Sequence, residues 1–224
     1  MPFEGPIRHG NAAGFELIET MRWEPQGGFL RGDRHLARLR ASAKTLGFDR
    51  DPQDAIAKAE ESVAGSEVPL RVRLTLSRDG AIATKSEIYV PLPDGAVWRL
   101  KLAHTRLHSA DPLLRYKTSR RAAYTRARSE HGHDRADEVL LANERGEICE
   151  GTITSLFADF GEKALLTPAL ACGLLAGVLR AEMIDNGAAK EAVFSYDDLR
   201  SARAVFVGNS LRGLIQAKPA WDQD

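Results

Sequence analysis

The chain has 224 residues, of which 43% are hydrophobic and 28% are charged. This composition is ordinary for a soluble globular protein, and the length suffices for one domain with a substantial core or for two small ones. Lysine and arginine together number 31, as do aspartate and glutamate, so the net charge is zero with histidine neutral. This balance argues against nucleic acid, an anionic membrane or an acidic protein as partner. It weakly favours a defined oligomer over a monomer.

The two cysteines, Cys149 and Cys172, belong to no CxxC or Cys/His cluster. The sequence therefore predicts two reduced, partly buried thiols and no metal site. The amino-terminal segment 1–10 has no apolar core and is not expected to be a signal peptide. No apolar run approaches the roughly 20 residues of a membrane helix. These features together predict a cytoplasmic protein without a membrane partner.

The first half of the chain carries strand and helix patterns in turn. Apolar residues at helical spacing predict a first helix that Asp33 can cap and Gly47 can end. The Asp79-Gly80 pair predicts a tight hairpin between two strands. In chain order, we expect a strand at 15–23, helices at 32–48 and 51–65, and strands at 69–77, at 81–90 and around Trp98 to Leu102.

The second half of the chain has its own sequence of elements. Ser195 and Asp198 have the spacing of a capping box for a short helix. In chain order, we expect a helix at 119–131, a strand at 137–142, a turn at 143–146, a β-like stretch at 148–160, a short strand at 164–167, a helix at 177–187, the capped helix and a last strand at 204–209.

The segment 91–96, with sequence PLPDGA, is the best linker candidate. We therefore expect a small amino-terminal α+β domain at 1–95 and a larger carboxy-terminal domain at 96–224. The strands do not alternate regularly with helices, so mixed or antiparallel sheets are favoured over a doubly wound parallel fold.

Lys117 lies in YKTSRRAAYTRAR, after a loop that contains Asp111-Pro112 and before a helix. Taken alone, this position is more often a surface lysine at the start of a basic helix. A basic patch for nucleic acid is not favoured, because at about 100° per residue the neighbouring arginines scatter around the helix. These arginines are Arg115, Arg120, Arg121, Arg126 and Arg128.

Glu150 lies in ICEGTITSLF, a stretch that is otherwise apolar or hydroxylic. Burying a carboxylate there is costly unless a cation meets it, and the alternative is an exposed glutamate at a strand edge. Further on, CGLLAGVLR runs into a helix whose first N–H groups, those of Val178 and Leu179, are suited to bind a phosphate. Ordinary turns from loop to helix have the same pattern.

Two further positions are candidates for binding. The strand VFVGN runs into a polar turn at Asn209 and Ser210, whose side chains can donate hydrogen bonds, although a plain turn is equally compatible. Arg31 precedes the first helix and is either an anion ligand or an ordinary surface arginine.

In their order along the chain, these segments resemble those of the fold-type IV pyridoxal phosphate enzymes, the class IV aminotransferase family. IETMRW followed by RGDRHLARLRASAKTLGF resembles the family's first strand and its Arg-x-x-x-His-x-x-Arg-Leu helix. YKTSRR resembles the segment with the Schiff-base lysine. ADEVLLANERGEICEGTITSLF resembles the family's most characteristic stretch, and TPALACGLLAGVLR its phosphate-binding loop and helix. The resemblance extends from about Phe15 to Ala217.

This resemblance implies an α+β fold of type IV, pyridoxal 5'-phosphate as cofactor and a homodimer acting on a small-molecule substrate. Lys117 would carry the cofactor as a Schiff base and, once released, act as the catalytic proton-transfer base. Glu150 would face the pyridine nitrogen and keep it protonated, which makes the ring an electron sink. The phosphate would be held by Arg31, the backbone of Val178 and Leu179, and the hydroxyl of Ser210.

Within the family, YKTSRRAAY and FVGNSLRGLIQA resemble the 4-amino-4-deoxychorismate lyases, which release pyruvate and leave 4-aminobenzoate, a folate precursor. The last turn reads Gly-Asn-Ser, where transaminases more often have Gly-Thr-Ala, so Asn209 is a candidate for binding substrate. The resemblance favours the lyase over a class IV aminotransferase acting on branched-chain or D-amino acids. A third alternative is a protein that binds the cofactor without robust catalysis, or a basic binding module.

Overall fold

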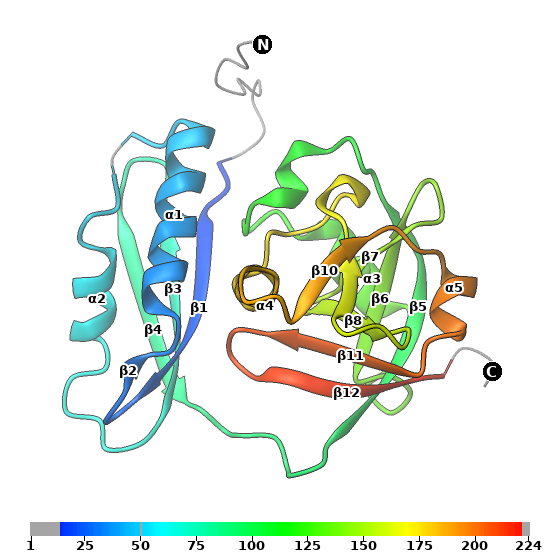
Figure 1. Cartoon of the computed structure of the whole chain (residues 1–224). Coiled ribbons are helices and arrows are strands. Elements are labelled where there is room, and N and C mark those ends of the chain that lie inside the picture. Colours follow the sequence, from blue (N-terminus) through cyan, green and yellow to red (C-terminus); the bar gives the residue numbers. More distant parts are fainter. Residues whose placement is uncertain (1–13, 50, 221–224) are drawn as a thin grey trace. The chain divides into compact units, whose positions relative to one another are not determined.

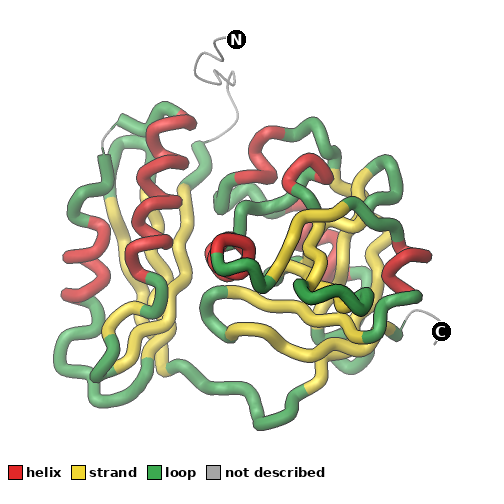
Figure 2. Tube along the Cα trace, in the orientation of Figure 1, coloured by secondary structure: helices red, strands yellow, loops and turns green. Residues whose placement is uncertain are grey.

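The computed structural model describes residues 14–49 and 51–220, which form two compact units (Figures 1 and 2). Within this range the first unit comprises residues up to 90 together with 116–120. The second comprises 91–115 and 121–220. Lys117 therefore groups with the first unit, although the segments before 116 and after 120 belong to the second. The segment 1–10, for which no signal peptide is expected, lies outside the described residues.

The first unit is a four-stranded antiparallel sheet with two helices (Figure 1). The strand order is β2-β1-β3-β4, and α1 contacts β1 while α2 contacts β3 and β4. Every second residue of β3 is buried, as its sequence pattern predicts. The elements are β1 (Leu17–Glu24), β2 (Gly28–Phe29), α1 (Gly32–Leu46), α2 (Ala55–Glu61), β3 (Leu70–Leu76) and β4 (Ile82–Ile88).

The two ends of α1 differ in how well the sequence predicts them. Gly47 ends the helix as expected, with a left-handed φ of 67° that glycine adopts at low cost. The expected cap at Asp33 is wrong, because the N-cap residue is Arg31 and Asp33 lies in the first turn. An acidic residue in the first turn still interacts favourably with the helix dipole.

The second unit contains a mixed sheet of eight strands in the order β10-β9-β8-β11-β12-β5-β6-β7. The pairs β10/β9, β12/β5 and β5/β6 are parallel and the others antiparallel. The sheet is curled: β7, at one end of the strand order, also contacts β8 and β9. Its elements are β5 (Val97–Leu107), α3 (Ala122–Ser129), β6 (Glu138–Asn143), β7 (Ile148–Gly151), β8 (Ser155–Asp159), β9 (Leu165–Pro168), α4 (Val178–Asp185), β10 (Ala189–Ala192), α5 (Tyr196–Arg200), β11 (Ala204–Asn209) and β12 (Gly213–Pro219), with 3₁₀ turns at Pro112–Arg115 and Leu170–Cys172.

This architecture confirms the predicted α+β class with mixed and antiparallel sheets. The capping box is present, with Ser195 and Asp198 bonding each other's backbone N–H at the start of α5. The expected β-like stretch at 148–160 is divided into β7 and β8 by a turn. The sequence analysis did not predict β2, β10 or β12.

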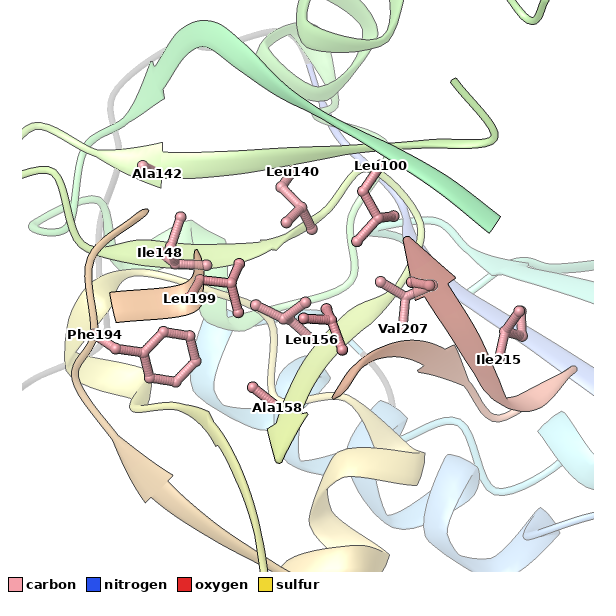
Figure 3. Close-up of a cluster of buried hydrophobic side chains, with 12 residues drawn as sticks. Leu100, Leu140, Ala142, Ile148, Leu156, Ala158, Phe194, Leu199, Val207 and Ile215 are labelled. Carbon is pink, nitrogen blue, oxygen red and sulfur yellow. The ribbon is translucent and has the colours of Figure 1, made fainter. Parts of the chain in front are cut away.

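The core inside the curled sheet is built from residues far apart in the chain (Figure 3). Leu100, Leu140 and Leu156 are fully buried and point toward a common interior from β5, β6 and β8 (Figure 3). The side chain of Leu199 reaches the same cluster from α5. Removing these aliphatic groups from water is the main favourable contribution to folding of this unit.

The two cysteines are free and buried, which confirms the predicted thiols. Burial raises the pKa of Cys149 far above its ordinary value and that of Cys172 to about 11. Both groups are therefore unreactive thiols at neutral pH. None of the helices in residues 14–49 and 51–220 is long and apolar enough to cross a membrane.

A buried ionic network ties α1 to the sheet of the first unit. Glu19, on β1, and His35, on α1, are each only 2% exposed, and the carboxylate lies 2.6 Å from His35 Nδ1. Arg38, one turn further along α1, donates from Nε and Nη2 at 2.9 and 2.5 Å. Burial raises the pKa of Glu19, but the charge and hydrogen bonds of Arg38 and His35 outweigh it and lower the pKa to about 2.

We expect Glu19→Gln to lower the free energy of unfolding by about 3 kcal/mol, because it leaves the largely buried guanidinium of Arg38 without its counter-charge. In the unmutated protein the folded-state pKa lies below the ordinary value of 4.5. The contribution is therefore fully present above pH 4.5 and is lost as the pH falls toward 2. Urea unfolding at several pH values measures both effects. Glu87→Gln, which removes an exposed carboxylate on β4, is the control. Equal shifts for the two variants would contradict the prediction.

Candidate active site

The backbone around Lys117 is fixed by pairing with the start of β1. The N–H of Ile18 donates to the carbonyl of Lys117 at 2.8 Å, and the N–H of Ser119 donates to that of Glu16 at 2.9 Å. Thr118, between them, is buried and bridges to Leu17. Because side chains alternate along an extended segment, the half-buried Lys117 side chain leaves the opposite side from Thr118. Lys117 is thus not part of a basic helix, since α3 begins only at Ala122.

Arg31 has an unusual backbone conformation. Its φ and ψ are 59° and 29°, and it is the one non-glycine residue with positive φ among the described residues. Its carbonyl accepts from the N–H of His35 in the first turn of α1. Strained backbone of this kind is concentrated at ligand-binding positions, so the observation supports a functional role for Arg31.

Glu150 is buried in β7, with only 4% of its surface exposed, so the alternative of an exposed strand-edge glutamate is excluded. Its Oε1 accepts the phenol O–H of Tyr124 at 2.7 Å and the backbone N–H of Leu175 at 3.0 Å. Burial, followed by the charge of Glu150, raises the pKa of Tyr124 well above its ordinary value, so the phenol remains a donor. Two donors on one oxygen fix the orientation of the carboxylate.

The start of α4 packs closely on the start of β8. A Cβ added at Gly177, which immediately precedes α4, would lie 2.7 Å from Ser155 Oγ. A side chain at this position would therefore require the Ser155 hydroxyl to move. The N–H groups of Val178 and Leu179 are in the first turn of the helix, so they have no acceptor within it. They are available to an anion at the positive end of the helix dipole.

The turn between β11 and β12 lies beside this helix start. Gly208 pairs with Ser155 across the sheet, and a Cβ added at Gly208 would lie 2.9 Å from Leu179 Cδ2. Ser210, whose hydroxyl is a predicted phosphate ligand, follows in the turn and is 7% exposed. The second unit thus brings the predicted helix N–H groups and the predicted hydroxyl to one end of its sheet.

Asn209 has a structural place in this turn. Its Oδ1 accepts the backbone N–H groups of Leu211 and Arg212 at 3.1 and 3.0 Å. Its Nδ2 donates to the carbonyl of Ile153 at 3.2 Å. The carboxamide thereby ties the β11–β12 hairpin to the turn between β7 and β8. Its predicted binding of substrate stays a prediction.

Sequence reasoning missed two residues of this arrangement, Tyr124 and Glu138. Tyr124 is the one aromatic side chain of α3 and contacts Glu150 from 26 positions away, so only its place in an arginine-rich helix could have drawn attention. Glu138 is a fully buried acid at the start of the apolar strand β6. An acidic residue before a continuous apolar run was a visible signal that was not used.

The sequence matches a known protein family over most of its length. The family model of class IV amino-transferases matches residues 16–219. The chain belongs to the class IV aminotransferase family. This confirms the resemblance inferred from the sequence, and the members of this family depend on pyridoxal phosphate.

Individual relatives carry two kinds of name. A Schizosaccharomyces pombe protein named "Putative aminodeoxychorismate lyase" is 31% identical over 185 residues, which cover 80% of this chain and 79% of that protein. A crystal structure named "Putative amino-acid aminotransferase" from Mesorhizobium loti is 60% identical, with a TM-score of 0.90, covering 92% of this chain and all of that one. A structure named "Putative 4-amino-4-deoxychorismate lyase" is 28% identical, with a TM-score of 0.77 over 92% and 84% of the two chains.

The donor set of the second unit fits pyridoxal phosphate. The helix N–H groups at Val178 and Leu179 suit a phosphate ester. Close packing at Gly177 excludes a side chain from that position. The buried carboxylate of Glu150 is a suitable acceptor for a protonated ring nitrogen. All four residues belong to the second unit, Glu150 on β7 and the other three at the start of α4.

We expect Gly177→Ala to weaken binding of pyridoxal phosphate by about tenfold or more, because the added methyl group overlaps Ser155 Oγ. The double variant Gly177→Ala/Ser155→Ala should recover most of the affinity, since the overlapping atom is gone. Titration of apoprotein with the cofactor measures both. Gly27→Ala, where the nearest atom lies at 3.6 Å, is the control and should bind normally. Failure of the double variant to recover would argue against the steric explanation.

Proposed function

We propose that this protein is a pyridoxal phosphate enzyme in which Lys117 holds the cofactor covalently. The observation that carries the proposal is the burial of the Glu150 carboxylate, fixed by Tyr124 and Leu175, in the same unit as the anion-binding start of α4. When bound, the cofactor supplies a protonated ring that accepts electrons from the substrate carbon. Family membership supports the assignment.

Each of the proposed site residues then has a definite task. The Glu150 carboxylate holds a proton on the ring nitrogen through a charge-assisted hydrogen bond. Arg31, the N–H groups of Val178 and Leu179, and the Ser210 hydroxyl bind the phosphate and so fix the position of the ring. The Nζ of Lys117 would take a proton from the substrate carbon and would return it to the departing group or to another atom of the substrate.

We expect Lys117→Ala to abolish the absorption band of lysine-bound cofactor and to lower the turnover rate about 10³-fold. A positioned general base contributes a factor of this order. Reduction with borohydride followed by peptide mass spectrometry should find the cofactor on Lys117 in the unmutated protein. Lys163→Ala, which removes an exposed lysine before β9, should leave both readouts unchanged. Cofactor trapped covalently in the Lys117→Ala protein would show that another lysine carries it.

For the reaction itself, we propose cleavage of 4-amino-4-deoxychorismate to 4-aminobenzoate and pyruvate. The Schizosaccharomyces pombe relative with 31% identity supports this assignment, as does the structure with 28% identity. The reaction removes one proton from the ring carbon that carries the amino group and expels the enolpyruvyl oxygen, which aromatises the ring. The reaction uses the same lysine and the same pyridine nitrogen of the cofactor as transamination, and it consumes no keto acid.

Amino-group transfer is the second candidate, and one observation favours it. The Mesorhizobium loti structure, at 60% identity over the whole of its chain, is named as an amino-acid aminotransferase. A transaminase acting on branched-chain or D-amino acids would use the same residues. It would return a new amino acid only when a keto acid is supplied as the second substrate.

We expect purified holoenzyme to release pyruvate from 4-amino-4-deoxychorismate in the absence of any keto acid, with 4-aminobenzoate formed in equal amount. A coupled assay for pyruvate and fluorescence of 4-aminobenzoate measure the two products. The Lys117→Ala protein is the matched control and should give neither product. Absence of pyruvate together with transfer of amino groups from branched-chain or D-amino acids to 2-oxoglutarate would instead establish the transaminase.

A further inference from the structure

The carboxyl group of Glu138 is buried without a cationic partner among the described residues. The residue is 0% exposed at the first position of β6. Its Oε1 accepts the N–H groups of Val139 and Thr152 at 2.8 and 3.0 Å and the hydroxyl of Thr152 at 2.5 Å. Its Oε2 accepts the N–H of Ile153 at 3.1 Å and the hydroxyl of Thr154 at 2.8 Å. Backbone dipoles and hydroxyls therefore satisfy it, at considerable desolvation cost.

Four of these five bonds go to one turn, Thr152–Thr154, which joins β7 to β8. The turn is packed tightly on the carboxyl group, since a Cβ added at Gly151 would lie 2.8 Å from Glu138 Cδ. Arg121 also donates to the carbonyl of Thr152. The conformation of the turn is thus set by a side chain that comes from a different strand.

The turn is connected on both sides to residues of the candidate active site. On one side it follows Glu150 by two positions. On the other, the carbonyl of Ile153 accepts from Asn209, which orders the hairpin that carries Ser210. A continuous chain of hydrogen bonds therefore leads from Glu138 through the turn to this hairpin.

We infer that Glu138 is a positioning residue, whose buried carboxylate fixes the turn Thr152–Thr154 and thereby the placement of Glu150 relative to the Ser210 hairpin. This inference rests on the proposed cofactor site, in which Glu150 and Ser210 bind opposite ends of one rigid molecule. Because that molecule has a fixed length, a shift of the turn prevents both contacts from forming well together.

Glu138→Gln tests the need for two acceptor oxygens. A glutamine has one acceptor oxygen and one NH₂ group. In either orientation the NH₂ group faces at least one backbone N–H, that of Ile153 or those of Val139 and Thr152, and a donor facing a donor forms no hydrogen bond. The turn must then move, even though the size of the side chain is unchanged.

The first measurement is hydrogen exchange of the apoprotein, which does not depend on the proposed function. Glu138→Gln should increase exchange in segment 148–158 and also in segment 205–215, which Glu138 does not contact directly. Asp137→Asn changes the neighbouring carboxylate, which bonds Arg99 and not the turn, and should leave both segments unchanged. Faster exchange in 148–158 alone would overturn the inferred coupling to the hairpin.

The second measurement is the dissociation constant for pyridoxal phosphate. We expect it to rise at least tenfold in Glu138→Gln and to stay unchanged in Asp137→Asn. Leu199→Ala, which destabilises the core and removes none of the hydrogen bonds of Glu138, is the control for a general loss of stability and should bind normally despite a lower Tm. Tight binding by Glu138→Gln, or equal weakening in Leu199→Ala, would overturn the inference. If the unmutated protein does not bind the cofactor, the proposed function itself is wrong.

Discussion

The second unit depends on how it satisfies carboxylates that are buried in its sheet. Glu138 and Glu150 are 0% and 4% exposed, and a buried carboxylate is tolerated only when donors replace water. The donors to Glu150 come from α3 and from the loop before α4, and four of the five donors to Glu138 come from the turn after β7. The loop before α4 and the turn after β7 are therefore held in one conformation by side chains from the strands.

The buried carboxylate of the first unit is stabilised in a different way. Glu19 is paired with Arg38 and His35, so charge attraction between side chains joins α1 to β1. Glu138, by contrast, bonds mostly backbone N–H groups and hydroxyls of one short turn. Pairing with side chains joins two elements while leaving their backbones some freedom. Pairing with consecutive backbone N–H groups specifies a backbone conformation, which is what a site for a rigid ligand requires.

The sequence predicted those features that depend on local chemistry. Alternation predicted β3, a glycine directly after the last apolar residue at helical spacing predicted the end of α1 at Gly47, and the spacing of Ser195 and Asp198 predicted a capping box. It missed β12, although buried Ile215 and Ala217 alternate there with exposed Gln216 and Lys218, and although the strand forms a hairpin with β11. The contact of Tyr124 with Glu150 was missed because a contact between positions far apart in the chain leaves little local signal. Glu138 was missed although an acid at the head of an apolar strand was visible.

The Gly-Asn-Ser turn illustrates how a sequence difference acquires a structural explanation. Asn209 accepts two backbone N–H groups with its oxygen and donates to the carbonyl of Ile153 with its nitrogen. A threonine at this position would have a single hydroxyl on a shorter side chain, and it could not span the same three partners. Asparagine here is accounted for by the attachment of the hairpin to the turn that Glu138 holds. Direct contact with substrate is not needed to explain its presence.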